Sequence, residues 1–456
     1  MNFGEIKKVH FVGIGGIGMS AVAEILASSG MTVSGCDLKR SASTDLLASR
    51  GIEVSLGHDP SHVEGQELIV YTAAVKGANS EVDAARERGI RIMRRSEALG
   101  EIVNQQRAVG VSGTHGKTTT SAMVATVLAE AGLDPTVIVG GIVRNFATNA
   151  MRGAGEFLVV EADEYDRTFH HLHPEVAIVT NIEADHLEYF GSLDAVFEAF
   201  RIYLEGVRPG GRIVACIDDA GVRRVLGEYS GEARLVRYGL SEGAEIRATG
   251  ITYDERGAAF QVPGVGFVRL FVPGEHNVRN ALAAIGAARE FGVASEKIVA
   301  GLAKFLGVDR RFQILGEYGG AVIVDDYAHH PTEIHATLRA ARQGYPGRRI
   351  VALFQPHLYS RTREFAQEFA DSLVEADVAL VAPIYAAREQ PVEGVSAKLI
   401  SELAKKIEFL DRSNTQIVNE LRRRIAPNDI FIAMGAGDVH EIAEALVRGS
   451  VEGGAE

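Results

Sequence analysis

The sequence predicts an α/β protein with three domains, each built on a largely parallel sheet. Short apolar runs such as 68–72 and 350–354 alternate with segments of helical periodicity, a pattern typical of parallel strands joined by helices. Glycine-rich stretches follow two predicted strands, at 13–18 and 113–116, as in strand-loop-helix units that bind phosphates. The length of 456 residues fits three domains of about 150 residues each. We expect the domains to span 1–94, 95–309 and 310–456.

Composition and charge limit the class of protein. Hydrophobic residues make up 46% of the chain, and no run approaches the ~18 apolar residues of a membrane helix, so no membrane association is expected. The first residues lack the order of a signal peptide, which favours a cytoplasmic location. A net charge of -13 disfavours a nucleic-acid partner. Cys36 and Cys216 indicate neither a disulfide framework nor a cysteine metal cluster, so we expect core or neutral positions for both.

The first domain opens with a strand and a glycine loop. The loop has the spacing G-x-G-x-x-G, a helix pattern follows it, and a second strand ends at Asp37. Glycines in this pattern allow close approach to a pyrophosphate, and an acidic residue about 20 positions on can bind a ribose. The spacing predicts a Rossmann-like nucleotide-binding domain, with a glycine turn that only packs a helix on a sheet as the alternative. The loop residues are Gly13, Gly15, Gly16, Ile17 and Gly18.

A second glycine loop, within 108–120, is the centre of the predicted chemistry. An apolar strand leads into this loop and a good helix pattern follows it. Such a loop and its helix dipole bind a phosphate chain, with Lys117 on the outer phosphates and the Thr118 hydroxyl on Mg2+. Because Val111 stands five residues before Gly116, the usual G-x-x-x-x-G-K spacing is not met, and we predict a variant phosphate loop in a P-loop ATPase-like sheet. A glycine turn before an exposed lysine is the alternative. The predicted binding residues are Gly113, Thr114, His115, Gly116, Lys117, Thr118 and Thr119.

Two later strands of the central domain end in polar clusters, at 161–166 and 181–186. The first cluster begins with Glu161 and the second ends with His186. Ligands of an open parallel sheet bind at the carboxyl ends of its strands, so both clusters should face the edge that carries the second glycine loop. Oxygen ligands and an imidazole opposite a triphosphate suit Mg2+. Solvated acidic loops are the alternative for either cluster alone.

The end of the central domain combines a predicted hairpin with a helix. Alternating apolar and polar residues at 245–273, around a turn at 254–257, predict a small antiparallel hairpin. In the helix that follows, Asn277 and Asn280 are three residues apart and share one face of the first turn. Their amides could cap the helix or recognise a base, and spacing alone favours capping.

The third domain is predicted to be a Rossmann-like α/β unit with acidic, basic and histidine groups after its strands. One strand covers 322–326 and another 350–354. Polar residues at or after these strand ends include Asp326, Tyr327, His329, His357 and Arg361. The pattern of strands and helices predicts a third α/β unit with these groups at its strand ends.

Eight motifs, taken in order, resemble those of the Mur ligase family over nearly the whole chain. They are Gly-Ile-Gly-Gly-Ile-Gly-Met-Ser (13–20), Gly-Thr-His-Gly-Lys-Thr-Thr-Thr (113–120), Glu-Ala-Asp-Glu (161–164), Thr-Asn-Ile-Glu-Ala-Asp-His (180–186), Gly-Glu-His-Asn-Val-Arg-Asn (274–280), Arg-Arg-Phe (310–312), Asp-Asp-Tyr-Ala-His-His-Pro-Thr-Glu (325–333) and Phe-Gln-Pro-His (354–357). The resemblance implies that ATP phosphorylates the lactyl carboxylate of UDP-N-acetylmuramic acid. The amino group of L-alanine would then attack the acyl phosphate, in a cytoplasmic step of peptidoglycan precursor synthesis.

The resemblance also implies roles for individual residues. Thr118 and Glu161 would bind one Mg2+ and His186 a second. Asn277 and Asn280 would contact adenine. The third domain would complete the ATP site, with Arg311 on the phosphates and Asp326 on the ribose. The implied catalytic residues are Lys117, Glu161, His186 and Arg311. The UDP-sugar and the amino acid would be bound by Gly13, Gly15, Gly16, Ile17, Gly18, Asp37, Thr72, Tyr327, His329, His357 and Arg361.

Two departures from the family pattern bear on the substrate. Leu358 stands where many members have an arginine, so one contact to the amino-acid carboxylate is missing. Tyr165 stands where alanine-adding members have a serine, as in the member that attaches a whole tripeptide to the same UDP-sugar. The first glycine loop favours the alanine-adding activity. Two other classes stay open, an NAD-dependent dehydrogenase with an accessory nucleotide-binding domain and a non-catalytic nucleotide-binding regulator. The oligomeric state, monomer or weak homodimer, is not predicted.

Overall fold

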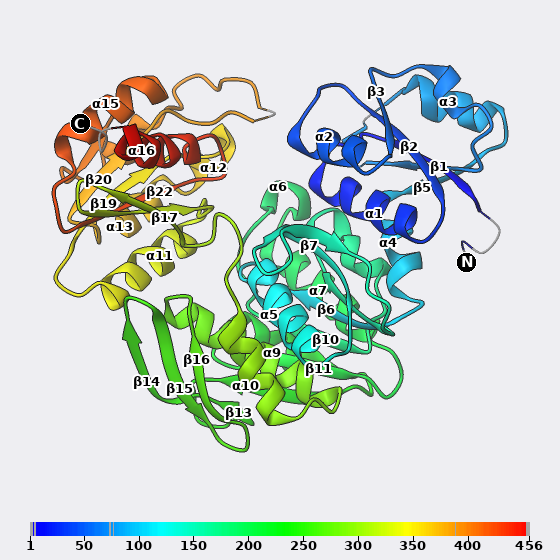
Figure 1. Cartoon of the computed structure of the whole chain (residues 1–456), viewed down its shortest axis with the longest axis horizontal. Coiled ribbons are helices and arrows are strands. Elements are labelled where there is room, and N and C mark those ends of the chain that lie inside the picture. The colour runs from blue at the N-terminus through cyan, green and yellow to red at the C-terminus, as the bar shows by residue number, and fades with distance from the viewer. Residues whose placement is uncertain (1–2, 4–5, 73, 76, 388, 453–456) are drawn as a thin grey trace. The chain divides into compact units, whose positions relative to one another are not determined.

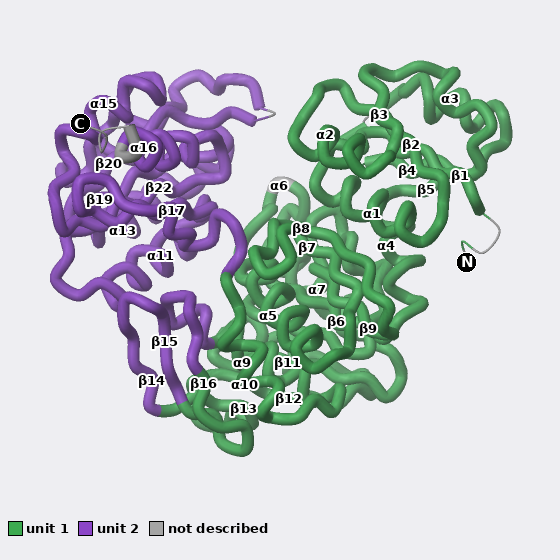
Figure 2. The backbone as a smooth tube through the Cα atoms, in the orientation of Figure 1, with its two compact units in different colours: residues 1–249, 261–268, 279–306 green, residues 250–260, 269–278, 307–456 purple. Residues whose placement is uncertain are grey.

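The computed structural model describes residues 3, 6–72, 74–75, 77–387 and 389–452, and its contacts divide the chain into two compact units (Figure 2). Unit 1 comprises residues 1–249, 261–268 and 279–306, and unit 2 comprises residues 250–260, 269–278 and 307–456. The described residues form sheets of five, eight and six strands and a further sheet of three strands. The predicted α/β class is therefore confirmed.

The first sheet has the order β3-β2-β1-β4-β5 and is parallel throughout (Figure 1). Its strands are β1 (Lys8–Val12), β2 (Thr32–Asp37), β3 (Glu53–Leu56), β4 (Leu68–Tyr71) and β5 (Arg91–Arg94). The helices between and after them are α1 (Ile17–Ser28), α2 (Ala42–Ser49), the 3-10 turn η1 (Pro60–Val63), α3 (Ser80–Glu87) and α4 (Arg95–Val103). Strand β1 is central and buried after its first residue, as expected where helices cover both faces of a parallel sheet.

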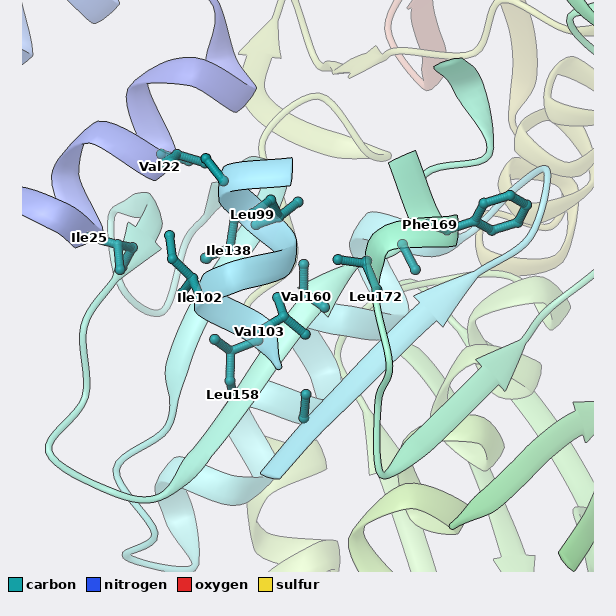
Figure 3. Close-up of a cluster of buried hydrophobic side chains, with 14 of the residues drawn as sticks. Val22, Ile25, Leu99, Ile102, Val103, Ile138, Leu158, Val160, Phe169 and Leu172 are labelled. Atoms are coloured by element: carbon teal, nitrogen blue, oxygen red, sulfur yellow. The ribbon is translucent and has the colours of Figure 1, made fainter. Parts of the chain in front are cut away.

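The first sheet and the central sheet of unit 1 share one hydrophobic core. Figure 3 shows Val22 of α1, Leu99 and Ile102 of α4, and Leu158 and Val160 of the central sheet within one cluster of buried side chains. Burial of apolar area contributes roughly 25 cal/mol per Å2, so this shared cluster favours packing of the two sheets as one body. Both sheets accordingly belong to the same compact unit.

The central sheet has the order β13-β12-β11-β10-β6-β9-β7-β8. Its strands are β6 (Arg107–Ser112), β7 (Thr136–Val143), β8 (Thr148–Met151), β9 (Phe157–Glu161), β10 (Val176–Val179), β11 (Arg212–Cys216), β12 (Arg234–Gly239) and β13 (Ile246–Arg247). Its helices are α5 (Lys117–Glu130), η2 (Tyr165–His171), α6 (Leu187–Phe190), α7 (Leu193–Glu205), α8 (Ala220–Glu228), α9 (Glu275–Glu290) and α10 (Ser295–Lys304). Strand β8 pairs antiparallel with β7, and the other pairs are parallel. Strands β9, β6 and β10 are neighbours, so their carboxyl ends lie at one edge.

The region predicted as a hairpin contains three strands. They are β14 (Thr249–Asp254), β15 (Gly257–Val262) and β16 (Gly266–Leu270). The turn between β14 and β15 lies where the sequence predicted it, but the prediction of a simple hairpin was incomplete. A second turn, at Gly264, has a positive φ that glycine tolerates, and it returns the chain as β16.

The sheet of unit 2 has the order β17-β18-β22-β19-β20-β21. Its strands are β17 (Gln313–Tyr318), β18 (Ala321–Asp326), β19 (Arg349–Phe354), β20 (Val378–Val381), β21 (Ile407–Phe409) and β22 (Asp429–Met434). Its helices are α11 (Pro331–Gly344), α12 (Tyr359–Glu364), α13 (Ala366–Leu373), α14 (Lys398–Ser401), α15 (Asn414–Arg424) and α16 (His440–Glu452). Only β17 runs antiparallel to its neighbour among the pairs described. In the described part of the chain, every helix is too short or too polar to cross a membrane.

Candidate active site

The second glycine loop joins β6 to α5 and has the backbone of a phosphate-binding turn. Gly113 has a φ of 136° and Gly116 a φ of 82°, values that glycine adopts without the strain a side chain would bring. A Cβ atom at Gly113 would collide with Thr180 Oγ1, and one at Gly116 would lie 2.8 Å from Asn280 Oδ1. Both positions therefore require glycine, because neighbouring side chains occupy the space of a Cβ atom and because the backbone has a positive φ.

The segment after β10 holds this loop in place through hydrogen bonds. The N–H of Thr114 donates to Asn181 O at 3.0 Å, and that of His115 donates to Asn181 Oδ1 at 2.8 Å. The Thr180 hydroxyl donates to His115 O at 2.7 Å, and the Glu183 N–H donates to Thr114 Oγ1 at 2.9 Å. Helix α5 begins at Lys117, and its first backbone N–H groups have no acceptor within the helix. They can therefore donate hydrogen bonds to an anion bound at the loop.

Lys117 lies at the centre of the site among carboxylates. Its Nζ atom donates to Glu164 Oε2 at 2.7 Å and to Gly113 O at 2.6 Å, and Asp163 Oδ1 is 4.0 Å away. Burial disfavours the ammonium form, but Glu164, Asp163 and Glu161 together raise the pKa of Lys117. Burial raises the pKa of Glu164 to about 7, against the lowering effect of Lys117. The lysine is thus held charged at the point where a phosphate chain would end.

Thr118 and Glu161 bring oxygen donors together beside Lys117. The Thr118 hydroxyl donates to the carboxylate of Glu161, with both oxygens at 3.0 Å, and the Gly140 N–H donates to Glu161 Oε2 at 2.6 Å. Burial raises the pKa of Glu161, while Lys117 lowers it. A hydroxyl and a carboxylate are the donor types that Mg2+ prefers, so these two side chains fit a magnesium ion.

His186 follows β10 and begins the short helix α6. Its backbone adopts a φ of 55°, and its N–H donates to Asp185 Oδ1 at 2.8 Å. The ring of Tyr165 lies 5.0 Å from the His186 ring and 5.6 Å from that of Tyr189. Glu161 ends β9, and His186 follows β10. These strands flank β6 and run parallel to it, so both residues come after strand ends at the edge of the sheet that carries the loop, as predicted.

The first glycine loop is also built closely onto its surroundings. Gly13 has a φ of 83°, and a Cβ atom there would lie 2.6 Å from Thr72 Cγ2. Asp37 Oδ2 accepts the Gly15 N–H at 2.8 Å, so this carboxylate orders the loop backbone directly. A Cβ atom at Gly18 would lie 2.8 Å from Arg95 Nη1. At the start of α1, Gly16 is the N-cap and the Ile17 side chain is 54% exposed.

Unit 2 brings Asp326 and Arg311 to the end of β18. The buried Asp326 carboxylate accepts the N–H groups of Phe312 and Ala328, each at 2.7 Å. Burial raises the pKa of Asp326 to about 6, although Arg311 lowers it. Arg311 donates to Glu333 Oε1 at 3.2 Å and lies over the Tyr327 ring. Its neighbours Arg310 and Phe312 both have positive φ, a strain that often marks functional positions.

Histidine and aromatic side chains gather near the same edge of unit 2. The rings of His329 and His357 are 6.1 Å apart, and His357 stacks with Tyr385 at 6.0 Å. Leu358 has a φ of 70°, and its N–H donates to Tyr385 O. Arg361 is buried within α12. The structure therefore brings His329, which follows β18, close to His357, which follows β19.

The two asparagines of α9 have different surroundings. The Asn277 amide donates to Pro273 O at 2.7 Å, a local contact at the start of the helix. Asn280 instead lies beside Gly116 of the phosphate loop. Donation to a carbonyl oxygen is not the role of a capping side chain, which accepts a helix N–H, so the hydrogen bond of Asn277 does not support capping. Contact of either asparagine with a base stays a prediction.

Several polar residues of the site were not singled out by the sequence. Glu164 and Asn181 lay inside the quoted motifs, and their places just after strand ends could have identified them. Arg95 and Glu333 make side-chain contacts with residues distant in sequence, Thr168 and Arg311 respectively, which the sequence does not reveal. Arg95 Nη2 donates to Thr168 Oγ1 at 3.0 Å and so links the region of the first glycine loop to η2.

A lysine held among buried carboxylates, at the end of a glycine loop and the start of a helix, defines an α/β protein that binds nucleotide phosphates. Three family models match successive parts of the chain. Residues 8–107 match the Mur ligase family catalytic domain, 111–288 the Mur ligase middle domain and 310–437 the Mur ligase glutamate ligase domain. The chain belongs to the Mur ligase family.

Individual relatives agree with this assignment. A UDP-N-acetylmuramate–L-alanine ligase of Salinibacter ruber is 44% identical over 97% of this chain and 95% of its own. The crystal structure of a UDP-N-acetylmuramate-alanine ligase from Thermotoga maritima is similar with a TM-score of 0.82 and 30% identity, covering 98% of this chain and 99% of that chain. A UDP-N-acetylmuramate:L-alanyl-gamma-D-glutamyl-meso-diaminopimelate ligase from Neisseria meningitides has a TM-score of 0.61 and 31% identity, covering 67% and 100% of the two chains.

Proposed function

We propose that this protein is an ATP-dependent ligase that joins L-alanine to the lactyl carboxylate of UDP-N-acetylmuramic acid through an acyl phosphate. The proposal includes a cytoplasmic location and a role in peptidoglycan precursor synthesis. Its main structural support is the buried ammonium group of Lys117, which lies 2.7 Å from Glu164 at the end of the glycine loop. The relative from Salinibacter ruber, whose printed name states this activity, supports the choice of amino acid.

The central site would act mainly by electrostatic stabilisation. A phosphoryl group in transfer spreads negative charge over its oxygens, and a fixed cation lowers the energy of that state. We propose that Lys117 exchanges its contact with Glu164 for the phosphates of ATP. Thr118 and Glu161 would hold one Mg2+ and His186 a second, and these ions would neutralise phosphate charge when bound.

Other side chains would bind and orient the substrates. We propose that the first glycine loop and Thr72 bind the UDP-sugar, and that Asp37 orders that loop through its bond to Gly15. Asn277 and Asn280 would recognise adenine. In the third domain, Arg311 and Asp326 would contact ATP, whereas the amino acid and the intermediate would meet Tyr327, His329, His357 and Arg361. The domain boundaries at 1–94, 95–309 and 310–456 belong to this proposal.

Phosphate release from ATP by the purified full-length protein tests the substrate assignment. We expect release to require both UDP-N-acetylmuramic acid and an amino acid, with L-alanine preferred over L-serine and glycine. Preference for the tripeptide L-alanyl-gamma-D-glutamyl-meso-diaminopimelate would instead favour the tripeptide-adding alternative. Absence of substrate-dependent phosphate release would favour a non-catalytic regulator. Thermal stabilisation by NADH without an effect of the UDP-sugar would favour the dehydrogenase alternative.

A further inference from the structure

A second cluster of chemically reactive side chains lies inside the first sheet, apart from the phosphate loop. It comprises His10 of β1, Cys36 of β2, His62 of η1 and Glu81 of α3. One ligand atom from each of these residues lies within 4.8 Å of the others. Residues far apart in sequence therefore converge on one point, and none of them has a role in the proposed reaction.

His10 directs an unsatisfied nitrogen into this cluster. Its side chain is 2% exposed, and its Nε2 atom has no hydrogen-bond partner within 3.5 Å, with Glu81 Oε1 3.7 Å away. The other ring nitrogen, Nδ1, lies 2.9 Å from Ser34 Oγ, a hydroxyl that can accept its proton and so leave the Nε2 lone pair bare. A buried polar atom without a partner costs free energy, whereas a histidine oriented by a hydrogen bond on its far nitrogen is the usual form of a metal ligand.

Glu81 places a carboxylate opposite that nitrogen. Its side chain is fully buried, and its Oε1 atom lies 3.7 Å from His10 Nε2 and 2.6 Å from His62 Nδ1. Its Oε2 atom lies 2.8 Å from Cys36 Sγ. His58 Nδ1 lies 3.1 Å from the same Oε2 atom, so this further histidine can orient the carboxylate from outside the set.

We propose that His10, Cys36, His62 and Glu81 form a binding site for Zn2+ or a chemically similar divalent transition metal. Two imidazoles, one thiolate and one carboxylate make a four-donor set of the kind that tetrahedral Zn2+ takes. Zinc bonds of about 2.0–2.3 Å place tetrahedral ligand atoms about 3.3–3.8 Å apart. The 3.7 Å between His10 Nε2 and Glu81 Oε1 lies within this range. The contacts of Glu81 with His62 at 2.6 Å and with Cys36 at 2.8 Å are hydrogen-bond distances, which would lengthen by several tenths of an ångström when the ion replaces the shared protons. A soft sulfur ligand distinguishes this site from the oxygen-rich position of Thr118 and Glu161.

The site lies directly behind the first glycine loop. The backbone oxygen of Cys36 accepts the N–H groups of Gly13 and Ile14, each at 2.9 Å. The next residue, Asp37, binds the Gly15 N–H. A metal held by Cys36 would thus anchor the end of β2, and we expect Zn2+ to stabilise the fold of this part of the chain by mass action.

Cobalt substitution in the full-length protein tests this site. The protein is stripped of metal with a chelator and titrated with Co2+, whose bond to a thiolate gives a charge-transfer absorption band in the near ultraviolet. We expect one equivalent of Co2+ to give the band and Zn2+ to displace it. The Cys36→Ser variant should lose the band, whereas Cys216→Ser should keep it because this second buried cysteine lies in β11 of the central sheet.

A less buried ligand provides an independent variant. The His62 side chain is 22% exposed, so His62→Asn should fold, as checked by circular dichroism, while its affinity for Zn2+ falls at least tenfold. Zn2+ should raise the melting temperature of the wild type and raise that of His62→Asn less. Absence of a Cys36-dependent band, or equal Zn2+ affinity in the wild type and His62→Asn, would overturn the proposal and leave a purely hydrogen-bonded cluster.

Discussion

Lys117 Nζ lies 2.7 Å from Glu164 Oε2 and 2.6 Å from the backbone oxygen of Gly113. The lysine is therefore folded back onto its own loop, and its charge is neutralised by a carboxylate that is itself buried. A phosphate chain at the loop would compete with Glu164 for the same ammonium group. This exchange links the geometry of the loop to the proposed chemistry.

Replacing Lys117 by alanine should remove the cation that offsets phosphoryl charge. We expect kcat for substrate-dependent phosphate release to fall at least about a hundredfold, the usual cost of losing one preorganised donor to transition-state charge. Lys297→Ala, at an exposed position on α10, is the matched control and should keep full activity. Wild-type rates in Lys117→Ala would remove this lysine from the mechanism.

Replacing Glu164 by glutamine should ease the exchange of Lys117 toward phosphate. Glutamine keeps the shape of the side chain but carries no negative charge, so the lysine leaves a weaker partner when ATP binds. We expect the Kd for ATP, measured by calorimetry without the other substrates, to decrease about tenfold. An unchanged or higher Kd would show that Glu164 does not compete with the nucleotide.

Replacing Gly113 by alanine should destabilise the loop. The new Cβ atom would collide with Thr180 Oγ1 and would sit on a backbone with a φ of 136°. We expect the free energy of unfolding, measured with urea, to fall by at least about 2 kcal/mol. Gly227→Ala is the control, because its Cβ atom would meet nothing within 4 Å in helix α8, and it should be neutral or slightly stabilising. Equal stability of the two variants would contradict the close packing at Gly113.

Replacing His186 by alanine should weaken metal binding at the central site. We expect the Mg2+ concentration for half-maximal activity to rise about tenfold or more, since a ligand to the ion is lost. His335→Ala, at a half-exposed position on α11, should leave the magnesium titration unchanged. A wild-type titration for His186→Ala would exclude this residue as a metal ligand.

The buried Asp326 should make stability depend on pH. Burial raises its pKa from 3.8 in an unperturbed carboxyl to about 6, so the native state binds this proton more tightly than the unfolded state. Its contribution is complete below pH 3.8 and is lost as the pH rises through about 6. Over that interval the wild type should lose about 3 kcal/mol of unfolding free energy relative to Asp326→Asn, which cannot titrate. A difference between the two proteins that stays constant with pH would contradict the raised pKa.

The sequence predicted the features that depend on residues adjacent in the chain. The strand, glycine loop and helix around Lys117 are contiguous, and acidic residues at the ends of β9 and β10 follow from the geometry of a parallel sheet. The fastening of the loop by Asn181 could not be predicted, because it depends on how two segments pack side by side. The third strand, β16, was missed because one alternating stretch does not reveal how many turns divide it.

The sequence also did not reveal which side chains surround Cys36, because they come from distant segments of the chain. Its position within a buried strand was predicted correctly, since its side chain is fully buried. The pairing of β1 with β2 and the packing of η1 and α3 bring histidines and Glu81 to the same thiol. No spacing in the sequence shows that arrangement. At Asp37, the pattern suggested a ribose contact, whereas the structure adds a bond to the loop itself.

The product of the reaction tests the ligase function most directly. The full-length protein would be incubated with ATP, Mg2+, UDP-N-acetylmuramic acid and L-alanine, and the nucleotide sugar would be analysed by mass spectrometry while phosphate is counted. We predict one phosphate released for each alanine attached to the UDP-sugar, and initial rates of both products at least about a hundredfold lower with Lys117→Ala. Phosphate release without an alanine adduct, or an adduct formed without ATP, would contradict the proposed ligase.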